Sequence, residues 1–162
     1  MEYGFEDVLI TTDRLELRPF CLEDVDDYFE YTSDAEMSVY TVAPSPFTRR
    51  RSEEDVVGSI LNLGKSTPNF AVLQDTRVIG DVWLDINQGS RAGEIGFSVA
   101  KIHWGEWLAS EAAVAVVEWN FTSGRLAKIS ARSDPRNRRA TRVLEKLAMT
   151  QEGVLRIHDI RN

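Results

Sequence analysis

The sequence has 162 residues, with 26 acidic against 19 basic side chains and a formal net charge of −7. A chain of this length buries roughly 70% of its unfolded surface, so we predict one domain over residues 1–162. The charge balance disfavours nucleic acid as a partner, and neither a run of roughly 18 apolar residues nor a basic leader indicates a membrane span or export. Cys21 has no disulfide partner, and His103 and His158 lack zinc-binding spacing, which predicts a cytoplasmic protein without a metal.

The first part of the chain predicts one strand and two helices. Alternating apolar side chains predict a strand over residues 14–20. Apolar residues at helical spacing over 22–31, with acids on the other side, predict the first helix. Ser52 and Asp55 form a capping box, so a second helix is expected to run from there through Leu63 and to stop at the glycine that follows.

The rest of the chain predicts strands and helices in alternation. The expected elements are a two-stranded hairpin over 70–87, a strand over 92–100, a helix over 107–121, a strand over 126–133, a helix over 137–149 and a strand over 153–160. A meander followed by a βαβ unit predicts an α/β or mixed α+β fold with a mixed sheet. The final strand would leave an open edge, so we expect either that the chain is shortened or that a second copy of the chain pairs there in a homodimer.

The stretch KIHWGEWLASEAA, residues 101–113, places a glycine-containing turn between a strand and the central helix. Free N–H groups and the positive end of the helix dipole at such a junction favour a phosphate group. Glu106 and Trp107 stand where small or basic residues are expected. The junction therefore predicts a phosphate site with two unusual neighbours.

Four stretches of the chain together carry a resemblance to a known family. They are TDRLELRPF, RVIGDVWLDI, GEIGFSVAKIHWGEWLASEAA and DPRNRRATRVLEKLAM. In this order they resemble the successive blocks of the GNAT superfamily of acyl-CoA-dependent N-acyltransferases, in particular its ribosomal-protein-alanine-acetyltransferase branch, which is RimJ/RimL-like. The resemblance covers nearly the whole chain. It implies a GNAT-like, mostly antiparallel six-stranded sheet flanked by helices, with the family's last strand missing, and acetyl-CoA as the cofactor.

The resemblance also implies where acetyl-CoA binds. The pyrophosphate would sit on backbone amides at the start of the central helix, and the pantetheine arm would pair with the fourth strand, which the family holds apart from the fifth. A backbone amide of the fourth strand would stabilise the oxyanion of the thioester. The implied cofactor-binding residues are Phe97, Ser98, Val99, Trp104, Gly105, Glu106, Trp107, Leu108, Ala109, Asn137, Arg138 and Arg142, with Arg139 beside them. Asn137 has a second interpretation, as the N-cap of its helix.

The turn departs from the family pattern Q/R-x-x-G-x-G/A at several places. Ile102 occupies the first place, Gly105 keeps the first glycine, and Trp107 replaces the second. Glu106 adds negative charge beside a phosphate, at a cost on the order of 1 kcal/mol if it is exposed. The phosphate site persists if the indole points away from it. These departures motivate the alternative that the chain is a catalytically silent acyl-CoA-binding or regulatory module of the same fold.

Glu94 matches the position of the general base in many relatives, where it would act beside the thioester, directly or through water. A strand-edge carboxylate in solvent or in an ion pair is an equally weighted interpretation. The tyrosine acid of the superfamily would fall on Leu144 and is absent. Its loss is tolerable, because a thiol with a pKa of about 8.5 leaves as thiolate for only about 2 kcal/mol at pH 7.

In this family, the acceptor is selected by the first two helices and their loop, here about residues 21–65. Residues 21–36 hold seven acids and no base, which would attract a cationic amine or form a solvated helix face. The run Arg49 to Arg51 could equally recruit a carboxylate-bearing acceptor, and Trp83 would line the acceptor cleft or pack in the core. We predict an N-acetyltransferase in which a primary amine, from a protein N-terminus or a small molecule, attacks the thioester directly.

Overall fold

The computed structural model describes residues 4–41, 46–63, 67–87 and 89–156. Its centre is a six-stranded sheet in which the strands lie in chain order. The strands are β1 (Ile10–Thr11), β2 (Glu16–Pro19), β3 (Asn69–Gln74), β4 (Arg77–Asn87), β5 (Ala92–Val99) and β6 (Lys128–Ser130). The first five strands pair antiparallel, and β6 pairs parallel with β5. The predicted mixed, mostly antiparallel six-stranded sheet is confirmed.

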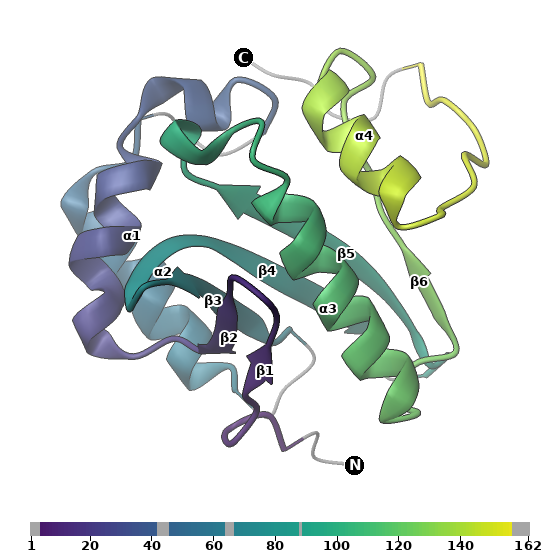
Figure 1. The fold of residues 1–162 in the computed structure, drawn as a ribbon, viewed down its shortest axis with the longest axis horizontal. Helices are drawn as coiled ribbons and strands as arrows, with labels where there is room; N and C mark the ends of the chain where they lie inside the picture. Colours follow the sequence, from purple (N-terminus) through teal and green to yellow (C-terminus); the bar gives the residue numbers. More distant parts are fainter. Residues whose placement is uncertain (1–3, 42–45, 64–66, 88, 157–162) are drawn as a thin grey trace.

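Helices cover both faces of the sheet. They are α1 (Val25–Thr32), α2 (Arg49–Leu61), α3 (Leu108–Thr122) and α4 (Arg138–Lys146), with short 3-10 helices η1 (Leu22–Asp24), η2 (Ala35–Ser38) and η3 (Lys101–His103). Figure 1 shows α3 lying across one face, with α1 and α2 on the opposite side and α4 beyond β6. No helix in the described ranges is long and apolar enough to cross a membrane.

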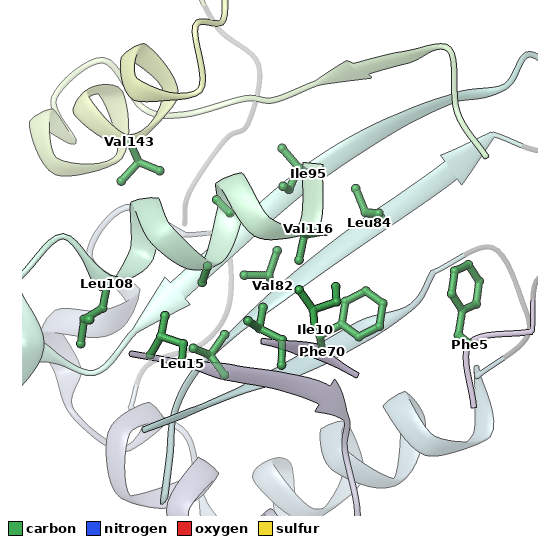
Figure 2. Close-up of a cluster of buried hydrophobic side chains, with 14 of the residues drawn as sticks. Phe5, Ile10, Leu15, Phe70, Val82, Leu84, Ile95, Leu108, Val116 and Val143 are labelled. Carbon is green, nitrogen blue, oxygen red and sulfur yellow. The ribbon is translucent and has the colours of Figure 1, made fainter. Parts of the chain in front are cut away.

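Two apolar clusters fix these helices to the sheet, one on each face. On the α3 face, Val82 and Leu84 of β4 pack with Val116 of α3, and all three are fully or almost fully buried (Figure 2). On the other face, which we call the α1 face, Tyr28 of α1 and Val56 of α2 pack in one cluster with sheet residues. Because side chains alternate along a strand, β4 contributes to both clusters and holds the two layers in register.

The second helix begins earlier than the sequence predicted. Thr48, rather than Ser52, is the N-cap, and its hydroxyl accepts a hydrogen bond of 3.2 Å from the amide of Arg51. Ser52 is buried and its hydroxyl hydrogen-bonds Thr32 at 3.0 Å. The extra turn is stabilised because each arginine of the run pairs with an acid four residues later. The helix ends at Leu61 rather than Leu63, and the expected stop at Gly64 lies outside the described residues.

The strand content also differs from the prediction at both ends. Strand β1 was not predicted, because its two residues are too few to show alternation. The strand expected over 153–160 is absent from residues 153–156, which are exposed and irregular, and residues 157–160 lie outside the described part of the chain. The sheet therefore reaches six strands through β1.

Candidate active site

Strands β5 and β6 diverge at the β6 edge of the sheet. Strand β6 pairs only with Ala92 to Glu94, at the beginning of β5. The remainder of β5, Ile95 to Val99, pairs with β4 alone within the described chain. Figure 1 shows β6 leaving β5 as it runs toward α4. Backbone groups on the β6 side of this segment are therefore available to an extended ligand, as a strand edge is in β-augmentation.

The β5–α3 junction keeps the backbone of the α3 start accessible. Gly105 has φ of 90°, and Trp107, the N-cap residue, has φ of 65°, which is left-handed backbone that L side chains rarely adopt. The Trp107 side chain makes no cap hydrogen bond. The first-turn amides of an α-helix lack intrahelical acceptors, and those of Leu108, Ala109 and Ser110 have no hydrogen-bond acceptor among the described residues, so an anion can bind them.

A cavity of about 140 Å3 lies at this junction, and we call it the α3 cavity. It is lined by Val99, His103, Trp104, Gly105, Trp107, Leu108, Ala109, Ser110, Arg139, Arg142 and Val143. Most of the residues predicted to bind the cofactor are thus brought together. The exceptions, which do not line the cavity, are Phe97, Ser98, Glu106, Asn137 and Arg138. Asn137 instead caps α4, accepting a hydrogen bond of 3.2 Å from the amide of Ala140, which confirms its N-cap interpretation.

The two unusual residues of the turn are held by neighbouring side chains. One carboxylate oxygen of Glu106 lies 3.1 Å from Nδ1 of His103, and its carbonyl accepts a hydrogen bond of 3.0 Å from Arg14. The indole of Trp107 is 48% exposed and lies 3.5 Å, centroid to Nζ, from Lys146 at the end of α4. The acid is therefore engaged with His103, and a cation–π contact fixes the indole.

Helix α4 brings positive charge to the α3 cavity. The guanidinium of Arg139 lies 3.7 Å from the ring centroid of Trp104, whose indole nitrogen donates a 2.9 Å hydrogen bond to the carbonyl of Val99. Arg142 lines the same cavity. Val143 of α4 packs in the α3-face core, which fixes the distance between the helix and the cavity. The cavity thus joins two guanidinium groups with the positive end of α3.

The donor set fits part of acetyl-CoA. Ser110 is 5% exposed, and its hydroxyl is a buried group without a hydrogen-bond partner among the described residues. Free amides, a free hydroxyl and two guanidinium groups are the donors that a diphosphate requires. Pockets for whole drug-sized ligands are about 300–1,000 Å3, so the α3 cavity has room for the diphosphate and not for the entire molecule.

A larger groove of about 1060 Å3 lies on the other side of the α3 start, between β1 and the exposed face of α3. Its charged lining residues are the acids Asp13, Glu111 and Glu118 and the bases Arg14 and Lys146. Arg14 is already paired with Glu111 and the acids outnumber the bases, so this groove is poorly suited to a phosphate group despite its size. The chemistry of the lining, rather than volume, therefore selects the α3 cavity.

Glu94, the predicted base, projects from β5 on the α1 face, directly across from Asp85 of β4. Its neighbour Ser130 is one of the last β6 residues before the two strands part. Both carboxylate oxygens of Glu94 lie 2.9 Å from Nε of Arg132, so the ion-pair interpretation is confirmed. This does not exclude a role in proton transfer, because each oxygen retains another lone pair.

Asp81 is a functional candidate that the sequence analysis missed. It lies on β4 across from Ser98, is 6% exposed, and accepts hydrogen bonds from Ser98 and, at 3.0 Å, from the hydroxyl of Tyr31 in α1. Burial raises the pKa of Asp81, and the hydrogen bonds from Ser98 and Tyr31 only partly oppose it. Its signal in the sequence was a charged residue inside the apolar run VIGDVWL.

The acidic stretch over 21–36 is largely neutralised by ion pairs. The pairs are Asp24 with Arg18, Asp26 with Arg49, Asp27 and Glu30 with Arg77, and Glu36 with Lys101. The arginine run is engaged in the same way, through Arg49 with Glu53, Arg50 with Glu54 and Arg51 with Asp55. Neither the acidic stretch nor the arginine run therefore presents a cluster of unpaired like charges. This favours the interpretation that both are solvated helix faces with ion pairs.

Sequence comparison with known proteins shows which family the chain is similar to. The family model described as "Acetyltransferase (GNAT) domain" matches residues 14–150. The uncharacterised N-acetyltransferase p20 of Bacillus licheniformis is 33% identical over 153 residues, which cover 91% of this chain and 85% of p20. The uncharacterised N-acetyltransferase YnaD of Bacillus subtilis (strain 168) is 33% identical over 147 residues, covering 89% and 84% of the two chains.

Solved structures agree with these sequence matches. A GNAT-family acetyltransferase from Bacillus anthracis superimposes with a TM-score of 0.81 at 30% identity, covering 90% of this chain and 86% of that chain. RimL, a ribosomal L7/L12 α-N-protein acetyltransferase, gives a TM-score of 0.87 at 17% identity and covers 96% and 87% of the two chains. At that identity the second comparison supports the fold alone.

Proposed function

The chain belongs to the GNAT acetyltransferase family, and on this premise we propose that it transfers the acetyl group of acetyl-CoA to a primary amine, either the α-amine of a protein N-terminus or a small-molecule amine. The single observation that carries the proposal is the α3 cavity, which joins free helix amides and two guanidinium groups to the end of β5. Within the described chain no strand pairs with the adjoining edge of β5 from Ile95 to Val99, although Trp104 donates to the Val99 carbonyl, so one extended ligand can occupy both the cavity and this edge.

Acetyl-CoA supplies an activated acyl group, and the protein has to hold the thioester and the acceptor amine next to each other. The free amides of the α3 start, Ser110, Arg139 and Arg142 would hold the diphosphate. A backbone amide within Phe97 to Val99 would stabilise the negative charge that develops on the thioester oxygen. The acceptor loses one proton to become a neutral amine, which attacks the thioester carbon. As the C–N bond forms, the C–S bond breaks, CoA leaves as the thiolate, and the nitrogen releases a second proton to give the amide.

The acceptor nitrogen must be neutral to attack. At pH 7 a lysine-like amine with a pKa of about 10.4 forfeits roughly 4.6 kcal/mol, whereas an α-amine with a pKa of about 7.7–8.0 forfeits only about 1 kcal/mol. Glu94 is the proposed base, and it shares its carboxylate with Arg132. A carboxylate that is also held in an ion pair suits an acceptor that needs little help to lose its proton. This favours the α-amine over a lysine-like amine as the acceptor.

Glu106 and Trp107 favour one alternative from another class, a catalytically silent acyl-CoA-binding or regulatory module. Titration calorimetry with acetyl-CoA and CoA, followed by a thiol-release assay over a panel of peptide α-amines and small primary amines, separates the two. Binding with turnover supports the enzyme. Binding without turnover on any acceptor supports the module, and absence of binding contradicts both. The cytoplasmic location and the homodimer stay predictions, and light scattering tests the latter.

A further inference from the structure

The α1 face of the sheet carries three cross-strand rows, and the strand register defines them. They are Ala71–Asp81–Ser98, Asn69–Trp83–Gly96 and Asp85–Glu94–Ser130. Helices α1 and α2 bury the first row, in which Asp81 is 6% exposed, while Asp85 of the third row is exposed. The middle row lies at the boundary between the covered and open parts of this face, and Trp83 is 36% exposed.

The indole of Trp83 lies over Gly96. A Cβ added at Gly96 would stand 2.0 Å from Cζ2 and 2.1 Å from Cε2 of the ring, far inside any van der Waals contact. Only glycine therefore permits this placement. Gly96 belongs to the part of β5 that β6 leaves unpaired, so the ring lies beside the opening in which the thioester is proposed to bind.

The surroundings of the ring suit a cation. Along β4, Asp85 lies two residues after Trp83 on the same face and is exposed, whereas Asp81, two residues before it, is buried and accepts hydrogen bonds from Ser98 and Tyr31. Within the described chain Asp85 has no ion-pair partner and Trp83 makes no ring or cation contact. In the same row, Oδ1 of Asn69 is buried and receives no hydrogen bond from the described residues.

We propose that Trp83 is the recognition platform of the acceptor site and binds the acceptor as an ammonium ion through a cation–π interaction. The proposal rests on the acetyltransferase function and deepens it by naming the protonated amine as the bound form. An α-amine or small primary amine is mostly protonated at pH 7, so this form is the abundant one. An aromatic face beside an exposed carboxylate, here Asp85, attracts a cation more strongly than a neutral group of equal size.

The first test compares variants that remove or displace the indole. Trp83→Leu removes the ring, and Gly96→Ala displaces it, because the new methyl group would occupy its place. Both should raise KM for the amine about fivefold or more and leave KM for acetyl-CoA unchanged, while Trp83→Phe should retain most of the affinity. Gly153→Ala, where the new methyl group meets open space outside the site, is the matched control. An unchanged amine KM in both indole variants would overturn the proposal.

The second test needs no turnover and therefore separates this proposal from the proposed function. Choline and its neutral isostere 3,3-dimethylbutan-1-ol are titrated into the protein while the indole N–H signals are followed by 15N NMR, with the Trp83 signal assigned from Trp83→Phe. Choline should shift the Trp83 signal and the neutral alcohol should not. Equal shifts with both probes, or no shift with choline, contradict the proposal even if acetyl-CoA binds and turns over. A choline-specific shift in a protein that binds no acetyl-CoA would support the platform and contradict the acetyltransferase.

Discussion

Nε of Arg132 lies 2.9 Å from both carboxylate oxygens of Glu94 and holds this side chain at the opening between β5 and β6. If Glu94 takes a proton from the acceptor, Glu94→Gln should lower kcat/KM about tenfold to a hundredfold for a small amine with a pKa near 10, and less than about fivefold for a peptide α-amine. Initial rates of thiol release with both acceptors measure the difference. Glu118→Gln, an exposed carboxylate on α3, is the control, and equal losses with the two acceptors would indicate a purely structural role for Glu94.

The α3 cavity predicts which arginine of α4 binds the cofactor. Arg142 lines the cavity and Arg138, one turn earlier, does not. We expect Arg142→Ala to weaken CoA binding about fivefold to tenfold, equivalent to about 1 kcal/mol, and Arg138→Ala to change it less than about twofold. Titration calorimetry at two salt concentrations measures both, and the Arg142 effect should shrink at the higher salt. Equal effects of the two variants would show that α4 acts through general positive charge.

Asp81 should make the free energy of unfolding fall as pH rises, which is opposite to the effect of a carboxylate whose pKa is lowered by folding. Because burial raises its pKa in the folded state, the native protein holds this proton to higher pH than the unfolded chain does. Its contribution to stability is therefore present below about pH 3.8 and is lost as pH rises through the folded pKa. Asp81→Asn keeps an acceptor for Tyr31 and Ser98 and removes the buried charge. We expect the variant to gain on the order of 1 kcal/mol over the parent at pH 7.5 and little at pH 4.5, measured by urea unfolding.

The control for this experiment lies on the same strand. Asp85→Asn changes an exposed carboxylate, so it should alter the urea midpoint little at either pH. A loss of stability in Asp81→Asn that grows with pH would show that the hydrogen bonds from Tyr31 and Ser98 outweigh the burial of the charge.

Local patterns predicted most of the fold. The central helix expected over 107–121 is α3 at Leu108–Thr122, and the strand expected over 92–100 is β5 at Ala92–Val99, because long periodic segments carry a strong signal. The start of α2 was missed because three arginines preceded the expected cap, and their ion pairs with later acids could be seen only once the helix was in place.

The two parts of the site differ in how far the sequence revealed them. The α3 cavity is built mainly from one continuous stretch, so the junction around Gly105 could be recognised directly. The α1 face is built from β3, β4 and β5, and Tyr31 meets Asp81 across 50 residues of chain. Strand register decides which residues share such a row, and a shift of one residue would place Trp83 on the other face. Alternation along β4 indicates that Asp81, Trp83 and Asp85 share a face, but it does not indicate which residues of β3 and β5 lie beside them.

Glu111 anchors the start of α3 to the β1–β2 turn and predicts a second pH effect. Thr12 donates a 2.5 Å hydrogen bond to its carboxylate, and Arg14 forms a 2.6 Å ion pair with it. Partial burial opposes ionisation of Glu111, but the hydrogen bonds from Thr12 and Arg14 outweigh it and lower its pKa. The stability that the ionised carboxylate contributes is therefore present above about pH 4.5 and is lost as pH falls through the pKa of the folded state. Glu111→Gln should therefore cost about 1 kcal/mol at pH 7 and less near pH 3, measured by urea unfolding. Glu118→Gln, exposed on the same helix, should show neither effect, and a pH-independent loss at position 111 would assign its role to packing alone.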